Sequence, residues 1–502
     1  MQPSELSGIS PDEFQAEYDR RGVATWSRQR LVAAATRTIA VPRRAAADSF
    51  VLHAPLELLA RAALLRFVAP AAEDAGRRRL VWLAASYDAA GAPVDELAPG
   101  APPTLEAAAA TLVAAITDGD LDAVDRYATF IGGNATPRDV HRLLAGAVAP
   151  SLAAAGHAPI LFNLLPHGDG QSTLLRGPAR ELACHPDWQL HWFDDATETA
   201  EAAAPTSLLD ALLDVPMLGL PGSDFIYPVM SQVQDSGLAA KLLAGPLGAQ
   251  TDPRQAGREI LRVAAWSMLQ EPPDHAPYGW THCLTMPQAV LGCAGTGFPV
   301  RVALAIAATH VAGFRAALGQ RHLVADAVPS ATPETDWRSA LDAEPAVAAA
   351  SVWHAAPSEV DAIVTELAGR ASAHYDAHLV KYTLACLDAR NTDPQYERTY
   401  LAAAASLTAW WQASSLVAAA AGGGVDGDGD EKHDRGDDEL RRGVETLQAH
   451  AVVDRGDHDA AEHRVDRLAS STEEARSADD RGRNRVQHEV AAIEVRRHGP
   501  QP

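Results

Sequence analysis

Two histidines and a lysine occur close together in the stretch HYDAHLVKYT, residues 374–383. If this stretch is helical, His374 and His378 lie one turn apart on one face, and Lys381 extends that face. Imidazoles titrate near neutral pH, relay protons and ligate metals, and a lysine beside them can help to polarise a carbonyl. The stretch therefore predicts a catalytic face that looks into a cavity. The polar edge of an ordinary helix is the alternative.

Three further histidines stand in apolar surroundings elsewhere in the chain. His157 lies in AAAGHAPILF, His282 in PYGWTHCLTMPQA and His310 in IAATHVAGF. A buried imidazole needs a partner for each ring nitrogen, so five such histidines exceed what packing alone requires. We expect these three to converge with His374 and His378 on a shared cavity as acid/base groups. For any one of them, a simple hydrogen bond to a backbone carbonyl is the alternative.

Aromatic and cysteine side chains accompany these histidines. Tyr278, Trp280 and Tyr382 are expected to bind a flat substrate, with core packing as the alternative for each ring. Cys283 and Cys386 also stand nearby, but unbridged cysteines in apolar helices are normally packing residues. Histidine with carboxylate and only four cysteines is not the signature of a closed zinc site, so the identity of any metal stays open.

The common cofactor fingerprints are absent from the sequence. There is no G-x-x-x-x-G-K-[ST] loop, and GCAGTGF at 292–298 lacks the spacing and the preceding strand of a dinucleotide site. Neither a G-x-S-x-G elbow nor an H-E-x-x-H motif occurs. An oxidoreductase built on this chain would therefore not hold its cofactor in a Rossmann site.

The elements that must position these residues are helices. Alanine-rich segments such as TLEAAAATLVAAI dominate the chain, and β-branched runs are few. Helix starts with a capping residue followed by proline recur, as at Thr136 and Pro137. The sequence predicts a mainly α fold, either a multi-helix single globular domain or two helical lobes. Dense proline and glycine predict a long irregular loop within 186–232.

Three regions differ in composition. Residues 1–45 are polar and arginine-rich and are interpreted as an N-terminal arm, and residues 46–421 as the helical domain. Residues 422–502 open with GGGVDGDGDEKHDRGDD and contain no Phe, Trp or Tyr. We expect a disordered, low-complexity acidic tail there, because little apolar surface is available to offset chain entropy. The same texture is typical of GC-rich DNA read in a wrong frame, so a frameshift product is an alternative.

Charge and targeting signals narrow the partners and the location. A net charge of −23 disfavours nucleic acids and anionic membrane surfaces as partners. The N-terminus lacks the basic and apolar regions of a signal peptide, and the scattered cysteines suit a reducing, cytoplasmic location. Residues 401–421 carry no charge, but alanine, serine and threonine make them a weak membrane span. A buried helix is expected there.

At GHAPILF, YGWTHCLTMPQA, ATHVAGFRAAL and HYDAHLVKYTLACLDA the sequence resembles the questin oxidase-like family. The resemblance implies a helical oxidoreductase of secondary metabolism, a monooxygenase that performs Baeyer–Villiger-type ring opening of aromatic polyketides. It also implies NADPH as electron donor without a Rossmann fold, and a pocket lined by His157, His282, His310, His374 and His378. The alternatives are a non-catalytic carrier of a small hydrophobic molecule and a metal or haem enzyme with histidine ligands.

Overall fold

A computed structural model describes residues 4–44, 49–99, 102–165, 171–193, 207–221, 226–248, 251–294 and 297–421. All of these belong to one compact unit, Met1–Gly424. Helices dominate the described residues, and the predicted mainly α domain is confirmed. The tail predicted over 422–502, with its frameshift alternative, lies outside the described residues.

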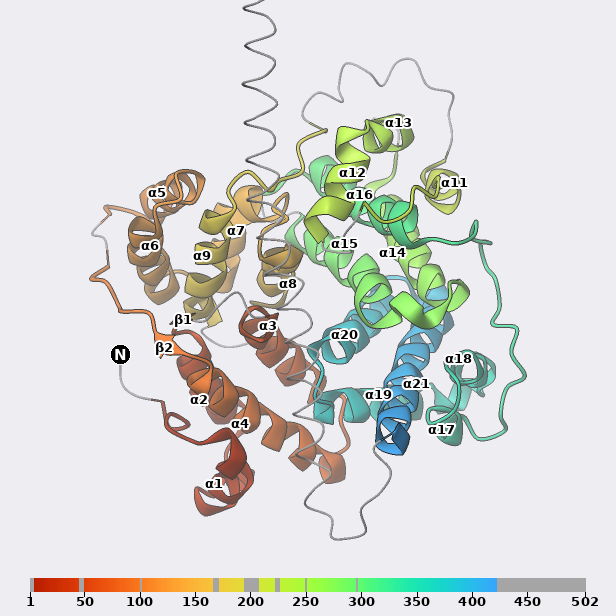
Figure 1. Cartoon of the computed structure of the whole chain (residues 1–502), viewed down its shortest axis with the longest axis horizontal. Helices are drawn as coiled ribbons and strands as arrows, with labels where there is room; N and C mark the ends of the chain where they lie inside the picture. Colours follow the sequence, from red (N-terminus) through yellow and green to blue (C-terminus); the bar gives the residue numbers. More distant parts are fainter. Residues whose placement is uncertain are drawn as a thin grey trace, which may run out of the picture. The chain divides into compact units, whose positions relative to one another are not determined.

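Most helices follow one another closely, but a long extended segment joins α16 to α17 (Figure 1). In the first part of the chain they are α1 (Phe14–Arg20), α2 (Arg28–Ile39), α3 (Ser49–Leu64), α4 (Glu73–Ala89), α5 (Leu105–Thr117), α6 (Leu121–Asn134), α7 (Pro137–Val148), α8 (His157–Leu164) and α9 (Arg176–Cys184). In the second part they are α11 (Leu208–Leu213), α12 (Ile226–Asp235), α13 (Leu238–Leu243), α14 (Pro253–Gln270), α15 (Thr281–Cys293), α16 (Val300–Leu318), α17 (Trp337–Ala340), α18 (Pro345–His354), α19 (Val360–Ala373), α20 (Ala377–Thr392) and α21 (Glu397–Ala421). Two short strands, β1 (Arg43–Arg44) and β2 (Ala92–Pro93), pair antiparallel.

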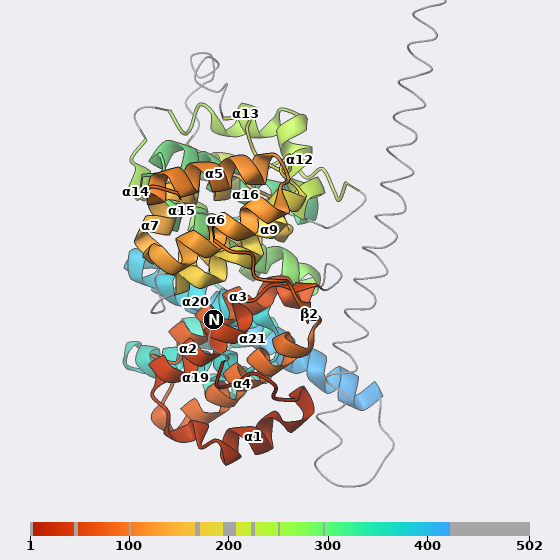
Figure 2. The same cartoon turned by 90° about the vertical axis from the view of Figure 1, so that its left-hand side faces the viewer.

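Four helices form a closed ring at the centre of this unit. α3 packs against α8, α8 against α15, α15 against α20, and α20 back against α3. Figure 1 shows the four gathered in the middle of the view, and in Figure 2 α3 and α20 again lie between α5 and α6 above and α1 below. Helices far apart in the sequence thus meet around one axis, and their inward side chains are shielded from water.

Local signals explain where several helices begin. Thr136 caps α7 and forms a capping box with Asp139, with Pro137 at the first helical position, as the sequence predicts. α3 begins at Ser49 and contains Pro55 in its interior, so His53 lies within α3.

Two sequence expectations about regularity are wrong. Residues 374–383 are not one helix: α19 ends at Ala373, His374 has extended backbone, and Asp376 caps the start of α20. The capping carboxylate accepts from the His378 N–H, which starts a new helix and removes His374 from its face. The irregular loop within 186–232 is shorter than expected, since Ser207 caps α11 and α12 follows.

Apolar helices lie in the core. Of the described helices, α16 alone is long and apolar enough to cross a membrane by length and composition, and 83% of its apolar window is buried inside the protein, as for a core helix. The first part of α21 is also buried, including Leu401, Leu407 and the alanines between them. This agrees with the buried helix expected at 401–421 for the residues whose side chains are described.

A buried arginine fastens α3 to the turn that begins α20. Arg61 on α3 has no exposed surface and forms an ion pair with Glu57 one turn earlier. Its guanidinium also donates to the backbone carbonyls of Ser372 and, at 3.0 Å, His374. These carbonyls stand at the end of α19, just before α20 begins. Arg61 therefore holds the start of α20 in position beside α3.

We expect Arg61→Met to lower the free energy of unfolding by about 3–5 kcal/mol, since it leaves the buried Glu57 carboxylate unpaired. Adding Glu57→Leu should recover part of that loss, because no unpaired charge remains. Arg66→Met is the control: it breaks a partly exposed ion pair between Arg66, which follows α3, and Asp388 of α20, and should cost under about 1 kcal/mol. Urea denaturation of the four proteins measures this, and equal losses for Arg61→Met and Arg66→Met would contradict it.

Candidate metal centre

The central ring brings four histidines together, one from each helix. His53 comes from α3, His157 from α8, His282 from α15 and His378 from α20. One nitrogen from each ring lies within 4.8 Å of the others, and all four side chains are buried. Figure 1 shows the four helices that carry them.

The nitrogens approach one another as ligands of one ion do. The Nε2 atoms of His53 and His378 are 3.2 Å apart, and those of His157 and His282 are 3.1 Å apart. With metal–nitrogen bonds of about 2.1 Å, adjacent ligands lie about 3.0 Å apart in octahedral and about 3.4 Å in tetrahedral geometry. Opposite ligands of an octahedron lie about 4.2 Å apart. Two of the nitrogen pairs thus stand at the separation of adjacent ligands, and the other pairs lie within 4.8 Å, so the four rings could hold one transition-metal ion.

Three of the four rings are held so that Nε2 carries a free electron pair. His157 Nδ1 is 2.8 Å from the Ala154 carbonyl, and His282 Nδ1 is 2.6 Å from the Tyr278 carbonyl. His378 Nδ1 is 3.0 Å from the Asp376 carboxylate. A carbonyl or carboxylate oxygen only accepts, so Nδ1 carries the proton and Nε2 of the neutral ring points its lone pair at the centre. This is how proteins orient histidine ligands of metals.

Unusual backbone supplies two of these carbonyls. Ala154, Ala155 and Gly156 all have positive φ, of 52°, 50° and 68°. Positive φ is strained for alanine, and this turn directs the Ala154 carbonyl onto the ring of His157 at the start of α8. A single turn of π-helix, Ala276–Trp280, precedes α15 and contains Tyr278. Such π-turns often occur at functional sites.

Lys381 reaches the same centre from α20, one turn after His378. Its Nζ lies 2.7 Å from His282 Nε2, 3.0 Å from His157 Nε2 and 3.4 Å from His53 Nε2. The amine can thus donate hydrogen bonds to the lone pairs, or stand beside a metal ion as a further nitrogen donor. Both uses require the side chain to be buried, and it is 2% exposed.

Burial sets the electrostatics of the group. Loss of hydration holds the pKa values of His157, His282 and His378 well below 6.5, and the positive charge of Lys381 adds to the effect. Burial also holds the pKa of Lys381 well below 10.5, against the opposing influence of Asp376. Neutral imidazoles and a neutral amine are the protonation states that bind metal ions.

Two of the predicted histidines are not among the four. His374 packs its ring on Tyr375 and Trp411, with ring centroids 4.3 and 5.2 Å away, and its Nδ1 accepts from the Asp376 N–H. His310 lies on α16 with no exposed surface, and neither ring nitrogen has a hydrogen-bond partner among the described residues. The structure therefore brings together His157, His282, His378 and Lys381 of the predicted set.

The sequence reasoning missed His53. The tripeptide His-Ala-Pro occurs at 53–55, 157–159 and 275–277, and His275 is not one of the four, so this motif does not single out His53. His53 lies within α3 and His157 begins α8, and the packing of these two helices brings their rings together.

The aromatic residues predicted to bind substrate divide into rim and core. The ring of Tyr278 stands edge-on to His378, with centroids 4.8 Å apart, and is 48% exposed. Trp280 and Tyr382 are fully buried. Arg315 forms a buried ion pair with Glu271, and its guanidinium lies over the Trp280 ring. Tyr278 thus marks the side of the centre that lies nearest to solvent.

Comparison with protein-family models, with curated proteins and with solved structures finds no match for the chain. The resemblance to the questin oxidase-like family therefore stays a prediction, and the chemistry of the site is argued from its own geometry.

Gly156→Ala should destabilise the protein and disturb His157. A Cβ at this position would lie 2.4 Å from Met286 Cε and would have to adopt positive φ. Strain and overpacking together predict a loss of about 2–4 kcal/mol in the free energy of unfolding. Gly133→Ala, in α6 with open space around it, should instead be neutral or stabilising by up to about 1 kcal/mol. Thermal and urea denaturation test this contrast, which an unaffected Gly156→Ala protein would refute.

His310 should make the protein sensitive to acid. Burial lowers its pKa from 6.5 to about 3, so the folded state stays neutral while the unfolded state takes up a proton below about pH 6.5. The contribution of His310 to the free energy of unfolding is therefore fully present above about pH 6.5 and is lost as the pH falls toward 3. The free energy of unfolding of His310→Phe, taken relative to that of the parent, should therefore rise by about 2–3 kcal/mol when the pH is lowered from 7 to 4.5. Urea denaturation at both pH values measures the gain, and a pH-independent difference would contradict it.

Proposed function

We propose that the chain is a metal-dependent oxidoreductase in which His53, His157, His282 and His378 hold one transition-metal ion. The observation that carries the proposal is the approach of four buried imidazole nitrogens to within 4.8 Å of one another. The Nε2 electron pairs of His157, His282 and His378 face one another in a buried interior, where they repel unless a cation or a hydrogen-bond donor lies between them.

The type of ligand narrows the choice of metal ion. Imidazole suits zinc, copper, iron and nickel, and the absence of carboxylate and carbonyl donors from the four disfavours magnesium and calcium. A bound iron or copper ion would supply Lewis acidity and one-electron chemistry, which the amino-acid side chains lack. The oxidative activity implied by the family resemblance requires such chemistry or an organic cofactor, so iron and copper are the ions that we propose.

The protein side chains have separate tasks in this proposal. The Ala154 and Tyr278 carbonyls and the Asp376 carboxylate fix the rings and raise their basicity. Lys381, whose pKa burial holds well below 10.5, accepts a proton from a phenol or a related acidic group of the substrate. Tyr278 at the exposed rim packs against an aromatic or other hydrophobic small molecule. NADPH as electron donor rests on the resemblance alone.

A haem does not fit this geometry. A porphyrin needs a flat slot between two axial imidazoles, whereas here four imidazoles and an amine share the same few ångströms. A mononuclear ion bound directly by the histidines needs no such slot.

Lys381 favours a second candidate function, a metal-free acid/base centre. Its amine lies within hydrogen-bond distance of three imidazole Nε2 atoms, so it can satisfy their lone pairs without an ion. In that case the cluster would bind and deprotonate a small hydrophobic substrate, or only carry it.

Elemental analysis of the purified full-length protein separates the two candidates. We expect about one iron or copper ion per chain, and loss of the metal in His157→Ala and His282→Ala. Asp376→Asn keeps a capping side chain but weakens the orientation of His378, and should lower metal affinity about 10–100-fold. His310→Phe removes a buried histidine outside the four and should retain the metal.

A metal-free parent protein that also fails to bind iron or copper on titration would refute the proposed function. Lys381→Met then decides between the remaining candidates. If the parent turns a substrate over and Lys381→Met does not, the acid/base centre is favoured. If the parent shows no turnover and Lys381→Met binds the same ligand as the parent, the carrier is favoured.

A further inference from the structure

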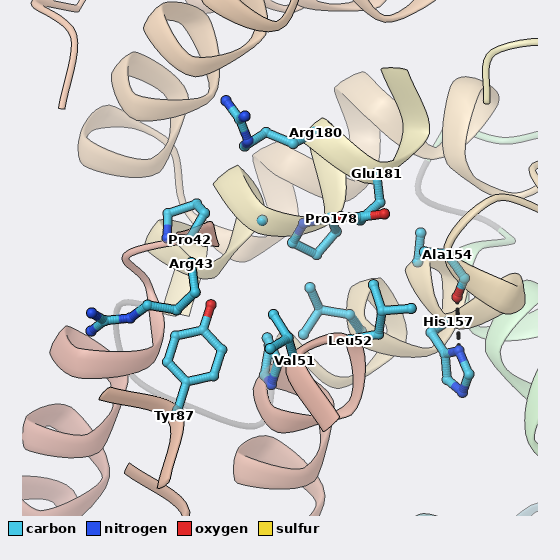
Figure 3. Close-up of a pocket in the computed structure, with 14 residues that line it drawn as sticks. Pro42, Arg43, Val51, Leu52, Tyr87, Ala154, His157, Pro178, Arg180 and Glu181 are labelled. Atoms are coloured by element: carbon cyan, nitrogen blue, oxygen red, sulfur yellow. Dashed lines mark hydrogen bonds between the residues drawn. The ribbon is translucent and has the colours of Figure 1, made fainter. Parts of the chain in front are cut away.

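A small cavity leads from the surface to one ligand of the centre. It lies between β1, α3, α4, α8 and α9, with His157 and Ala154 at one end and Pro42 and Arg43 at the other (Figure 3). None of its lining residues apart from His157 belongs to the four-histidine group. The cavity therefore approaches the centre from the side of α8.

The size of the cavity limits what it can admit. Its volume is about 50 Å³, whereas pockets for drug-sized ligands measure about 300–1,000 Å³. One water molecule needs about 10–15 Å³ of such space, so the cavity holds a few molecules of that size. A polycyclic substrate does not fit, but a molecule of two or three heavy atoms does.

The middle of the cavity is apolar. Val51, Leu52 and Pro55 of α3 face Leu161 of α8 and Pro178 of α9 as lining residues. Water gains few hydrogen bonds from such walls, while a neutral, weakly hydrated molecule loses little on entering. This part of the lining favours small apolar molecules over ions, whereas the charged lining residues are Arg43, Arg180 and Glu181.

Charge at the outer end does not reverse this preference. Arg43 forms an ion pair with Asp88, and Arg180 forms one with the buried Asp125. The Arg43 guanidinium also lies 5.6 Å from the ring centroid of Tyr87. Since each arginine already has a carboxylate partner, neither is a free cation that would attract a small anion.

The inner end of the cavity is rigid and close to the centre. The Ala154 carbonyl and the His157 ring that it holds both belong to lining residues, and the Nε2 atom of the same ring faces the other three histidines. The rim formed by Tyr278 and His378 is a different side of the group. The cavity and Tyr278 thus lie beside different members of the group, the cavity beside His157 and Tyr278 beside His378.

We propose that this cavity is the entry route by which dioxygen, a small neutral molecule, reaches the four-histidine centre. That the route ends at a metal ion rests on the proposed function. That dioxygen is the molecule that enters rests on the volume and the apolar part of the lining.

Two measurements test the route, one of them independent of any metal. Crystals of the full-length protein under xenon pressure should show a xenon atom among Val51, Leu52 and Leu161, because xenon occupies apolar cavities. Stopped-flow association of nitric oxide with the reduced, metal-loaded protein then reports how fast a dioxygen-sized molecule arrives at the centre.

Substitutions in the lining should change both readouts. Leu52→Trp should abolish the xenon site and slow nitric oxide association at least tenfold, with metal content unchanged. Val51→Ala widens the cavity without adding bulk and should speed association about twofold or more, which tests the route even if Leu52→Trp does not fold. Val324→Trp adds the same indole at an exposed position and should leave both readouts as in the parent.

The outcomes separate the two proposals. If the protein binds no metal, the proposed function is overturned before any rate is measured. Xenon binding still shows whether the cavity accepts a small apolar molecule. A metal-loaded protein whose nitric oxide rates are the same in Leu52→Trp, Val51→Ala and the parent overturns the route. If the substitutions slow azide but not nitric oxide, the cavity conducts anions, and its assignment to dioxygen is wrong.

Discussion

The constraint on which the structure depends is the mutual repulsion of imidazole lone pairs in a dry interior. Hydrogen bonds at Nδ1 force the Nε2 lone pairs of His157, His282 and His378 to face inward. Burial removes the water that would otherwise satisfy them. A cation or a hydrogen-bond donor placed among the lone pairs makes this arrangement favourable, and the surrounding helices hold the rings in place.

The four-helix ring meets this requirement by giving each helix one ligand and two neighbours. α3, α8, α15 and α20 pack in sequence around the centre, so a shift of any one helix would break contacts with two others. Local devices then set the ring orientations: a strained turn before α8, a π-turn before α15 and a capping carboxylate before α20. Each device stands at the beginning of its helix, where backbone geometry is least restricted by the helical hydrogen-bond pattern.

Lys381 is the residue that gives the centre two states. As a hydrogen-bond donor to three imidazoles it stabilises the group without metal, and as a neutral amine it leaves the lone pairs to an ion. The two states compete for the same electron pairs, so protonation of Lys381 opposes metal binding. The different surroundings of His157 and His378, one beside an apolar cavity and the other beside an exposed tyrosine, give the centre two chemically distinct sides.

The sequence by itself determined the helical class and the start of α7 at Thr136, and it singled out His157, His282, His378 and Lys381 as candidates together with His310 and His374. These features follow from local signals: alanine content, capping residues, and polar groups within apolar runs. Tertiary structure decided the rest. His374 is separated from His378 because the Asp376 cap begins a new helix between them, and His310 is buried on α16 outside the four. His53 joins His378 across 325 positions of sequence. Helical periodicity fixes which residues share a face within a helix, but which faces meet is fixed only by packing among helices distant in the chain.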